Sequence, residues 1–548
     1  MNPARISPQE WRRVSLFAAL AIALVMLPYA AGWAAQTADA RFSGAVIAAD
    51  DIHSYLGKMR LGARGIWDFT LFYTPEEHAA VPGVFLPYIA AGQLVGLLIA
   101  QDDPALTPAL IAVFHLMRVT FTLLLVAALY RFIAHFLSSP AQRMTALILS
   151  IVGGGFGWLL LLLPGGGDWL GSLPPDVFIP EGFGFLIALA LPHLALARAA
   201  LLLGFLALFH AVHRASAVYA LLAGLCWMLV GVIVPFYLAV IYCLLAAWVI
   251  VLALRMGVRA PALHRVLILG GAAAALTLPL FGYYALAFAA NPAFAAWSAQ
   301  NLLPAPHPLQ YLVAYSLFLI PGVPALRWAW RRGRARGETL LLIAWVIAAF
   351  VLVYLPINVQ RRMSEAVIVP LAILASHGLA VWLRARIPTR RRTRVRAGFL
   401  ALASLTSLVL LLLTTLGALS RSAPVHIAQA QIDALNWLNR SAPPDARILA
   451  AMPTGNLIPA YTHLRPYVGH GPETLNALDK QAETERYYAD SLSAAERAAL
   501  YRSVGIRYVY YGAAERALAL DVERRQWAQG LRLVYDAGGV EIYAVPPG

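Results

Sequence analysis

The chain has 548 residues, of which 60% are hydrophobic and 13% are charged, and its formal net charge is +15. This composition excludes a soluble globular protein and is typical of a polytopic membrane protein. The positive charge does not indicate nucleic-acid binding, because the arginines cluster between apolar segments and form no basic face with interleaved aromatic residues.

Eleven apolar segments are long enough to cross a bilayer, at about 1.5 Å of helix per residue. The first segment, 14–33, follows Arg12 and Arg13, and we interpret it as a retained helix; a cleaved signal peptide is the alternative. The run 216–254 is too long for one helix, and Pro235 divides it into two spans. The other segments are 108–130, 144–163, 184–212, 266–289, 308–326, 339–357, 365–383 and 397–419.

The arginine clusters between these segments predict the orientation of the chain. If the N-terminus, which carries Arg5, Arg12 and Arg13, is cytoplasmic, then eleven spans place every later arginine cluster on the cytoplasmic side of the membrane. The further apolar segment 81–100 contains prolines and glycines, and a crossing there would move those clusters outside. We therefore expect 81–100 to be re-entrant or interfacial. The clusters are Arg131 with Arg143, Arg214, Arg255 with Arg259 and Arg265, Arg327 to Arg336, and Arg384 to Arg396.

The last part of the chain has a different composition. After residue 420 it becomes polar, and strand-like runs such as RYVYYG (507–512) alternate with helical patterns such as SAAERAALYRSV (493–504). We predict a multi-span membrane domain over 1–420, with a first outer loop at about 34–80, and an exoplasmic α/β domain over 421–548. The fold class is a polytopic α-helical membrane protein with a C-terminal soluble α/β domain, placed in the inner (plasma) membrane with that domain outside.

The first outer loop concentrates titratable residues in a charge-poor chain. The spacing of Ile52, Leu56 and Met59 predicts a helix with Asp50 and Asp51 at its N-terminus. A single aspartate there would be interpreted as a helix cap, but two adjacent acids with more acids downstream favour a general base or a metal ligand at the membrane face. The further titratable residues of the loop include His53, Glu76, Glu77 and His78.

This arrangement resembles the GT-C class of membrane glycosyltransferases, including the protein O-mannosyl and aminoarabinose transferases. The features that carry the resemblance are a short N-terminal span, an outward acidic pair, Tyr55 and the G-x-W sequence at 65–67. The class pattern is close to D-E-x-x-[YF]; the step from Asp51 to Tyr55 keeps its spacing, but Ile52 replaces the second acid and Asp50 precedes the first. The resemblance implies that the catalytic carboxylate is Asp51, with Asp50 as the alternative.

The resemblance also implies the reaction. A GT-C enzyme transfers a hexosyl or pentosyl group from a polyprenyl-phosphate-linked donor to an acceptor at the outer membrane face. A carboxylate can deprotonate the acceptor in an inverting displacement, and the leaving phosphate then requires cations. Arg361 and Arg362 lie in an outer loop, against the charge bias, and we expect them to bind the donor phosphate; pairing with Glu365 is the alternative. We expect these cations and the acidic pair to line one exoplasmic pocket.

Other residues are weaker candidates for the same site. Arg118 lies three residues after His115 near the outer end of a span, where it can bind phosphate or extend towards the membrane surface. His193 follows Pro192 at an expected helix break, and a structural role is the favoured interpretation. In the tail, GHGPET (469–474) can present His470 and Glu473, although structural turn residues are the safer interpretation. The remaining candidates for substrate contact are His53, Tyr55, Glu76, Glu77, Asp176 and Glu181.

No ligand spacing predicts a metal site, and both cysteines, Cys226 and Cys243, lie within apolar segments. A divalent cation such as Mg²⁺ or Mn²⁺ is an open alternative that the reaction does not require. The expected partners are a lipid-linked sugar donor, the membrane and an unidentified acceptor, without nucleic acid. The main alternative function is a transporter or flippase of lipid-linked saccharides, which paired repeats and mid-membrane charges would favour.

Overall fold

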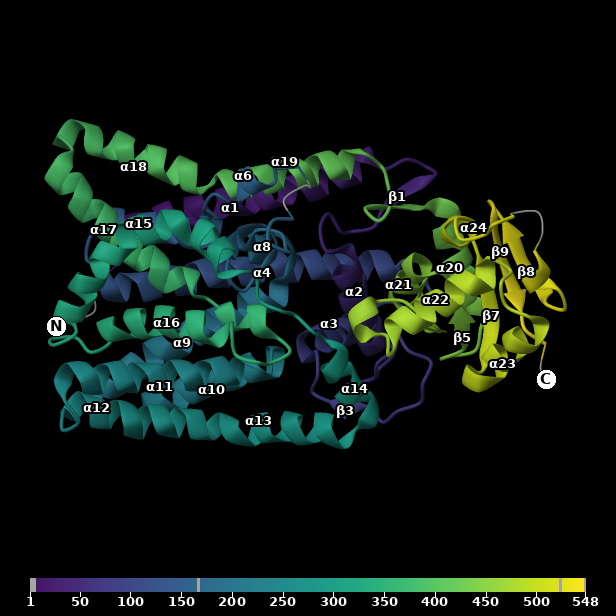
Figure 1. Ribbon diagram of the computed structural model, residues 1–548, viewed down its shortest axis with the longest axis horizontal. Coiled ribbons are helices and arrows are strands. Elements are labelled where there is room, and N and C mark those ends of the chain that lie inside the picture. The colour runs from purple at the N-terminus through teal and green to yellow at the C-terminus, as the bar shows by residue number, and fades with distance from the viewer. Residues whose placement is uncertain (1–5, 165–167, 522–524, 547–548) are drawn as a thin grey trace. The chain divides into compact units, whose positions relative to one another are not determined.

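The computed structural model describes residues 6–164, 168–521 and 525–546, so Arg5 lies outside the described residues. The chain forms two compact units, which are described separately. Unit 1 comprises residues 1–27, 117–285 and 302–413, and unit 2 comprises residues 28–116, 286–301 and 414–548. Four of the boundaries fall within helices α1 (Pro8–Ala35), α4 (Leu106–Phe136), α13 (Gly271–Ala290) and α19 (Leu405–Leu419), which are labelled in Figure 1.

The named elements in the described part of unit 1 are all helices, apart from one isolated β-bridge between Trp169 and Ser172. Within it α9 packs against α10, α15 against α17, and α11 against α16. Besides its portions of α1, α4, α13 and α19, its elements are α5 (Pro140–Val152), α6 (Gly157–Leu160), α7 (Pro175–Phe178), α8 (Gly184–Ala190), α9 (Pro192–Arg214), α10 (Ala217–Ile233), α11 (Tyr237–Met256), α12 (Pro261–Arg265), η1 (Val266–Gly270), α15 (Pro308–Arg332), α16 (Thr339–Leu352), η2 (Gln360–Ser364), α17 (Ile368–Arg386) and α18 (Thr389–Ala403).

The described residues contain eight helices that are long and apolar enough to cross a membrane. A ninth span results if α18 and α19, which are bent by 47° relative to each other, are counted as one. The two other predicted spans correspond to α10 and α16, which have 17 and 14 residues and are shorter apolar helices. The prediction of a polytopic helical membrane protein is confirmed. The eight helices are Pro8–Ala35, Leu106–Phe136, Pro140–Leu160, Pro192–Arg214, Tyr237–Met256, Pro261–Ala290, Pro308–Arg332 and Ile368–Arg386.

Two apolar segments are interrupted. The predicted span 184–212 is divided, because α8 ends at Ala190 and α9 starts at Pro192, whose ring nitrogen cannot continue a helical hydrogen-bond ladder. The segment 81–100 begins with a short strand at 81–82 and continues as the 11-residue helix α3 (Leu86–Gly96). A helix of that size is about 16 Å long, roughly half of the hydrocarbon thickness of a bilayer. It is therefore too short for a through-going span, as the charge pattern predicts.

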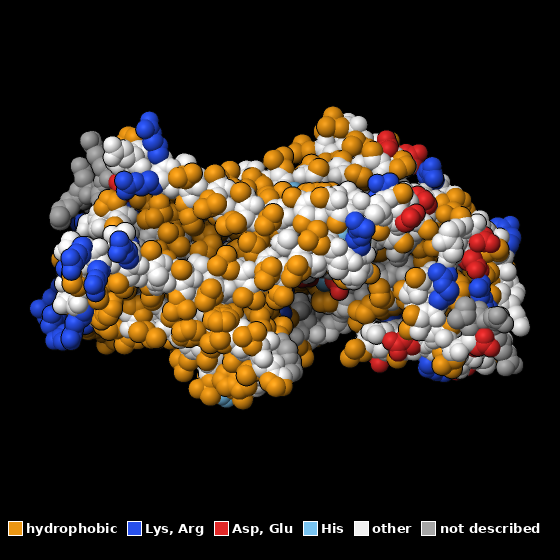
Figure 2. All heavy atoms as spheres, turned by 90° about the horizontal axis from the view of Figure 1, so that it is seen from above, with side chains coloured by type: hydrophobic (Ala, Val, Ile, Leu, Met, Phe, Trp, Pro, Cys, Tyr) orange, Lys and Arg blue, Asp and Glu red, His pale blue; other side chains and the backbone are white. Residues whose placement is uncertain are grey.

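The surface of the helical unit is apolar, as expected for contact with lipid. Side chains such as Leu16, Leu254 and Ile268 are exposed. Figure 2 shows hydrophobic side chains covering much of the helical surface, while Lys and Arg side chains gather at one end of it. The chain is a multi-pass membrane protein.

Unit 2 combines the first loop with the C-terminal tail. A five-stranded sheet has the strand order β6-β5-β7-β9-β8, in which β6, β5 and β7 are parallel and β9 is antiparallel to both β7 and β8 (Figure 1). The strands and helices predicted in the tail are confirmed, whereas a domain boundary at residue 420 stays a prediction. The elements of the tail are β4 (His426–Ala428), α20 (Gln429–Ser441), β5 (Arg447–Leu449), α21 (Met452–Tyr461), β6 (Arg465–Pro466), η3 (Gly471–Glu473), α22 (Ala477–Tyr488), α23 (Ala494–Val504), β7 (Ile506–Tyr511), α24 (Ala513–Arg516), η4 (Gln526–Ala528), β8 (Arg532–Ala537) and β9 (Val540–Ala544).

The other elements of unit 2 surround the helix that carries the acidic pair, α2 (Ala49–Ala63). This helix packs against α3 and α21. A Cβ atom at Gly92 would collide with the carbonyl oxygen of Met59, and one at Gly455 would collide with that of Val468. Glycine at these two positions therefore lets α3 pack closely against the backbone of α2, and α21 against the backbone of the segment before His470. The remaining elements are β1 (Ala40–Phe42), which pairs with β4, β2 (Asp68–Phe69), which pairs with β3 (Val81–Pro82), and α14 (Pro292–Gln300).

Candidate functional site

The acidic pair lies in the first turn of α2, as predicted, but it does not cap the helix. The residue at the N-cap is Ala48, which has a left-handed conformation (φ 48°), and no side chain forms a cap hydrogen bond there. Ile52, Leu56 and Met59 are buried on the inner face of the helix. The carboxylates of Asp50 and Asp51 are thus held at the positive end of the helix dipole without serving as its cap.

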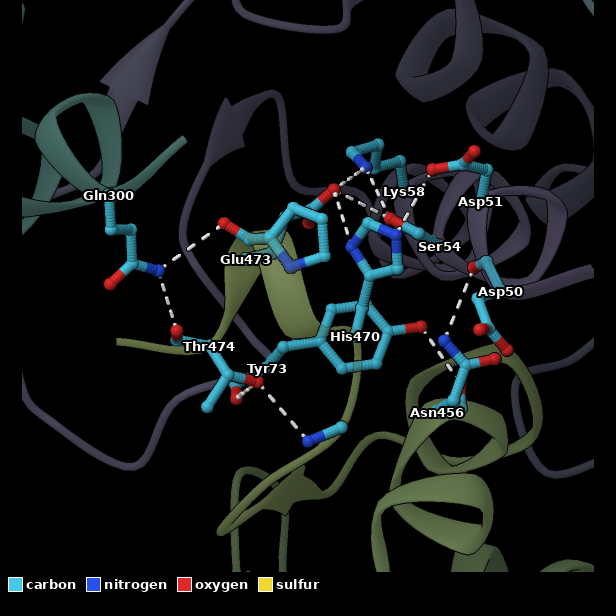
Figure 3. A network of polar contacts seen from close by, with 12 residues as sticks. Asp50, Asp51, Ser54, Lys58, Tyr73, Gln300, Asn456, His470, Glu473 and Thr474 are labelled. Atoms are coloured by element: carbon cyan, nitrogen blue, oxygen red, sulfur yellow. Dashed lines mark hydrogen bonds and ion pairs between the residues drawn. The ribbon is translucent and has the colours of Figure 1, made fainter. Parts of the chain in front are cut away.

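A histidine from the tail contacts one of the two aspartates. His470 Nε2 lies 3.1 Å from Asp51 Oδ1, and His470 Nδ1 lies 3.5 Å from Glu473 Oε1. The His470 side chain is only 6% exposed, whereas that of Asp51 is 49% exposed. Figure 3 shows the Asp51 carboxylate directed towards His470, while that of Asp50 points elsewhere. The imidazole therefore connects a buried carboxylate to an accessible one.

A buried ion pair fixes the tail against α2. Lys58 Nζ donates to Glu473 Oε1 at 2.7 Å and to Ser54 Oγ at 2.5 Å, and Ser54 Oγ donates to Glu473 Oε1 at 2.8 Å. Burial acts to raise the pKa of Glu473, but the adjacent Lys58 and His470 outweigh it and hold that pKa below the usual range. Glu473 is therefore a carboxylate at neutral pH, and it anchors η3 to α2 (Figure 3).

Helix α21 supports the first turn of α2 from a second direction. Asn456 Nδ2 donates to the Asp50 carbonyl at 3.2 Å, and Asn456 Oδ1 lies 3.0 Å from His53 Nδ1. Burial lowers the pKa of His53, so its imidazole is neutral at pH 7, and Nδ1 carries the proton because Asn456 Oδ1 is an acceptor. Tyr73 donates its hydroxyl to the Asn456 carbonyl at 2.8 Å. His53 thus supports the backbone of the acidic turn.

The other candidates in the first loop contact the tail or neighbouring aromatic rings. Glu76 pairs with Lys480 at 2.5 Å, and the exposed Glu77 pairs with Arg447 at 2.9 Å. The ring of Tyr55 is stacked on that of Tyr88, with centroids 4.5 Å apart. These contacts give Glu76 and Glu77 a role in joining the first loop to the tail.

The candidate phosphate ligands lie in unit 1, on η2. Arg361 lines a cavity of about 360 Å³ together with Phe178 and His307, and its guanidinium lies 5.1 Å from the centroid of the Phe178 ring. Arg362 Nε is 3.6 Å from the buried carboxylate of Glu181. An arginine beside an open cavity has the charge and the donor geometry that phosphate recognition requires.

Glu365, the alternative partner of these arginines, forms a buried ion pair with Arg198. Glu365 Oε1 accepts from Arg198 Nε at 2.7 Å, and both side chains are 1% exposed. The Trp345 indole donates to the Glu365 carbonyl at 3.2 Å. This buried pair secures the segment between η2 and α17.

Three other candidates, Asp176, Arg118 and His193, lie in unit 1. Asp176 accepts hydrogen bonds from the Gly155 amide at 3.1 Å and from the Thr406 hydroxyl at 2.8 Å. Arg118 donates to the Leu189 carbonyl at 3.0 Å, at the break between α8 and α9. His193 is half-buried at the start of α9. Phosphate binding by Arg118 stays a prediction.

Comparisons with known proteins identify the fold. No protein-family model matches the sequence, and no curated protein matches it. The oligosaccharyltransferase of Archaeoglobus fulgidus in its apo form superposes with a TM-score of 0.53 and 14% identity, over 97% of this chain and 74% of that one. The archaeal oligosaccharyltransferase AglB from the same organism, in complex with an inhibitory peptide and a dolichol-phosphate, gives a TM-score of 0.52 and 13% identity over 96% and 74%. The chain has the fold of a GT-C glycosyltransferase.

A bacterial structure is also similar. ArnT from Cupriavidus metallidurans, bound to undecaprenyl phosphate, has a TM-score of 0.49 and 12% identity, over 99% of this chain and 100% of that one. The predicted resemblance to the GT-C class is thus confirmed for the fold, on the oligosaccharyltransferase structures. The roles of individual residues in this GT-C fold remain predictions.

The contacts of four residues were missed by sequence reasoning. His470 and Glu473 were expected to be structural turn residues of the tail, and no contact between the first loop and the tail was predicted for Asn456 or Lys58. Composition offers one signal: only two of the 42 basic residues are lysines, Lys58 and Lys480. Each of them forms an ion pair in unit 2, with Glu473 and Glu76 respectively. A common pocket for Asp51 and the η2 arginines stays a prediction.

Proposed function

We propose that the protein transfers a sugar from a polyprenyl-phosphate-linked donor to an acceptor at the outer face of the inner membrane. The observation that carries the proposal is the accessible Asp51 carboxylate, which a buried histidine contacts at 3.1 Å from a distant part of the chain. The fold supports it, because an oligosaccharyltransferase with this fold has been solved with a dolichol-phosphate. Fold likeness alone does not assign an activity, so the site must carry the argument.

The proposed reaction is an inverting displacement in which Asp51 is the general base. The acceptor hydroxyl or amine attacks the anomeric carbon and gives its proton to the Asp51 carboxylate. The bond between the anomeric carbon and the phosphate oxygen breaks, and the polyprenyl phosphate leaves with the electron pair. Arg361 and Arg362 bind this phosphate and stabilise the charge that develops on it.

The buried residues position the base. His470 contacts the Asp51 carboxylate, and the ion pair between Lys58 and Glu473 holds the segment that carries His470. A base whose side chain is held in one orientation needs less rearrangement when the acceptor arrives. Asp50, exposed in the same turn, is the alternative base.

The decisive experiment separates transfer from transport. The full-length protein is reconstituted into liposomes with a polyprenyl-phosphate sugar that is labelled in the sugar, and membrane extract is added as a source of acceptor. We expect label to leave the lipid and free polyprenyl phosphate to accumulate, and Asp51→Asn to stop both. Movement of intact labelled lipid to the other leaflet, without release of polyprenyl phosphate, would instead establish the flippase alternative.

A further inference from the structure

Three side chains that commonly bind metals meet in unit 1, far along the chain from the acidic pair. His135 lies in the last turn of α4, His213 in the last turn of α9, and Glu338 directly before α16. Their ligand atoms all lie within 4.8 Å of one another. We propose that these three residues bind a divalent transition-metal ion, with Zn²⁺ preferred.

The carboxylate in this cluster is buried without adequate partners. Glu338 is 4% exposed, and neither of its carboxylate oxygens accepts a hydrogen bond from the described residues. His213 Nε2 forms an ion-pair contact with Glu338 Oε1, and His135 Nε2 lies 3.9 Å from the same oxygen. The contact with His213 still leaves Glu338 Oε2 without a hydrogen-bond partner among the described residues, which is costly for a buried carboxylate, and a bound cation removes that cost.

Neighbouring contacts hold the ligands in place. The Trp248 indole donates to the Gly337 carbonyl at 2.9 Å, and Arg336 Nη1 lies 3.4 Å from the His135 carbonyl, to which it donates. The ring of His135 is also stacked on that of Phe209, with centroids 4.7 Å apart. The turn that carries Glu338 is therefore fixed beside the end of α4, as a preformed site requires.

The geometry and the ligand types fit zinc. A tetrahedral Zn²⁺ ion bound at about 2.0–2.1 Å keeps its ligands roughly 3.4 Å apart. His135 Nε2 lies 3.9 Å from Glu338 Oε1 and needs only a small shift, whereas His213 Nε2 contacts the same oxygen directly and has to move away from it to admit the ion. Two imidazoles and one carboxylate suit Zn²⁺, whereas Mg²⁺ and Ca²⁺ prefer oxygen ligands only. The His213 side chain is 55% exposed, so water can reach a fourth coordination position. The ion would join α4, α9 and the start of α16.

The test measures zinc bound by the full-length protein, purified in detergent without a histidine tag and stripped with EDTA. We expect one equivalent of Zn²⁺ that His213→Ala removes, and Zn²⁺ should raise the thermal unfolding midpoint of the wild type but not of His213→Ala. His210→Ala is the matched control, because His210 lies one turn earlier on α9 and its ring faces Tyr219 at 5.5 Å. The Asp51→Asn variant should also bind one equivalent of Zn²⁺.

X-ray absorption spectroscopy of the zinc-loaded wild type provides a measurement that does not depend on the folding of any variant. It should report two imidazole nitrogens and one carboxylate oxygen around the metal. Equal zinc binding by wild type and His213→Ala, or a zinc shell without imidazole, would overturn the proposal. Absence of zinc binding would leave His213 and Glu338 as a simple ion pair and would overturn it as well.

Discussion

His470 Nε2 lies 3.1 Å from Asp51 Oδ1, although 419 residues separate the two in the chain. The contact joins the C-terminal tail to the acidic turn of the first loop within unit 2. It also distinguishes the two aspartates, because Asp50 contacts the tail through its backbone carbonyl, which accepts from Asn456. The tail therefore contributes directly to the candidate site.

The first prediction concerns this histidine as a positioning residue. We expect His470→Ala to lower kcat for sugar transfer by about 10- to 100-fold, because a misplaced general base reacts more slowly. The pH profile of kcat should change too, whereas KM for the donor should change little. His463→Ala is the control, since the His463 ring lies 3.0 Å from the Ala442 carbonyl, elsewhere in the tail. An equal loss in both variants would contradict the role of His470.

The second prediction concerns the buried ion pair. We expect Lys58→Met to destabilise unit 2 by about 3–5 kcal/mol, because it leaves the buried Glu473 carboxylate without its cation. Adding Glu473→Gln to that variant should restore part of the loss, as measured by thermal unfolding. The exposed pair of Arg486 and Glu496 is the control, and Arg486→Gln should leave the unfolding midpoint almost unchanged, because solvent screens an exposed pair. Additive losses in the double variant would show that the two residues are not coupled.

The third prediction concerns pH. Burial lowers the pKa of His53 in the folded protein, so the unfolded chain binds a proton more readily. The stability that neutral His53 provides is present in full above about pH 6.5 and is lost as the pH falls towards the folded pKa. Glu473 also has a lowered pKa, and its contribution is present above about pH 4.5 and lost only at lower pH.

The measurement is the thermal unfolding midpoint between pH 7.5 and 5. We expect the midpoint to fall over this range, and His53→Gln to make the fall shallower. Part of the fall should persist, because burial also lowers the pKa of His78 and of His463. If the fall of the midpoint with pH were equally steep in His53→Gln, His53 would bind a proton equally well in the folded and the unfolded protein.

The fourth prediction concerns the arginines of η2. We expect Arg361→Gln to raise KM for the donor and to lower kcat by about 10- to 100-fold, because the leaving phosphate loses a cation. Inhibition by free polyprenyl phosphate should weaken in parallel. Arg331→Gln, in an exposed part of α15, is the matched control and should behave like the wild type. Unchanged product inhibition in Arg361→Gln would exclude phosphate binding by Arg361.

Local sequence patterns predicted most elements of the fold. The periodicity of Ile52, Leu56 and Met59 located α2, and the strand-like run RYVYYG located β7 in the tail. These predictions succeed because helix and strand periodicities are properties of neighbouring residues. The helix break at Pro192 was expected, although 184–212 was counted as one span, because a proline inside an apolar run can either bend a helix or end it.

The contacts of the candidate site could not be predicted in the same way. The short sequence GHGPET indicates a turn, but nothing local shows that the turn packs against a helix more than 400 residues earlier. The Lys58–Glu473 pair and the Asn456 contacts depend on the same tertiary packing. Local sequence could not predict the proposed metal-ligand cluster either, because His135, His213 and Glu338 come from three separate helix ends.

The most direct test of the account compares Asp51→Asn with Asp50→Asn in single-turnover transfer from a labelled polyprenyl-phosphate sugar. Both residues lie in the first turn of α2, so the two variants are matched in position and in charge change. If Asp51 is the general base, Asp51→Asn should slow transfer by about 10²- to 10⁴-fold, while Asp50→Asn stays within about tenfold of the wild type. Transfer at the wild-type rate by correctly folded Asp51→Asn would contradict the account.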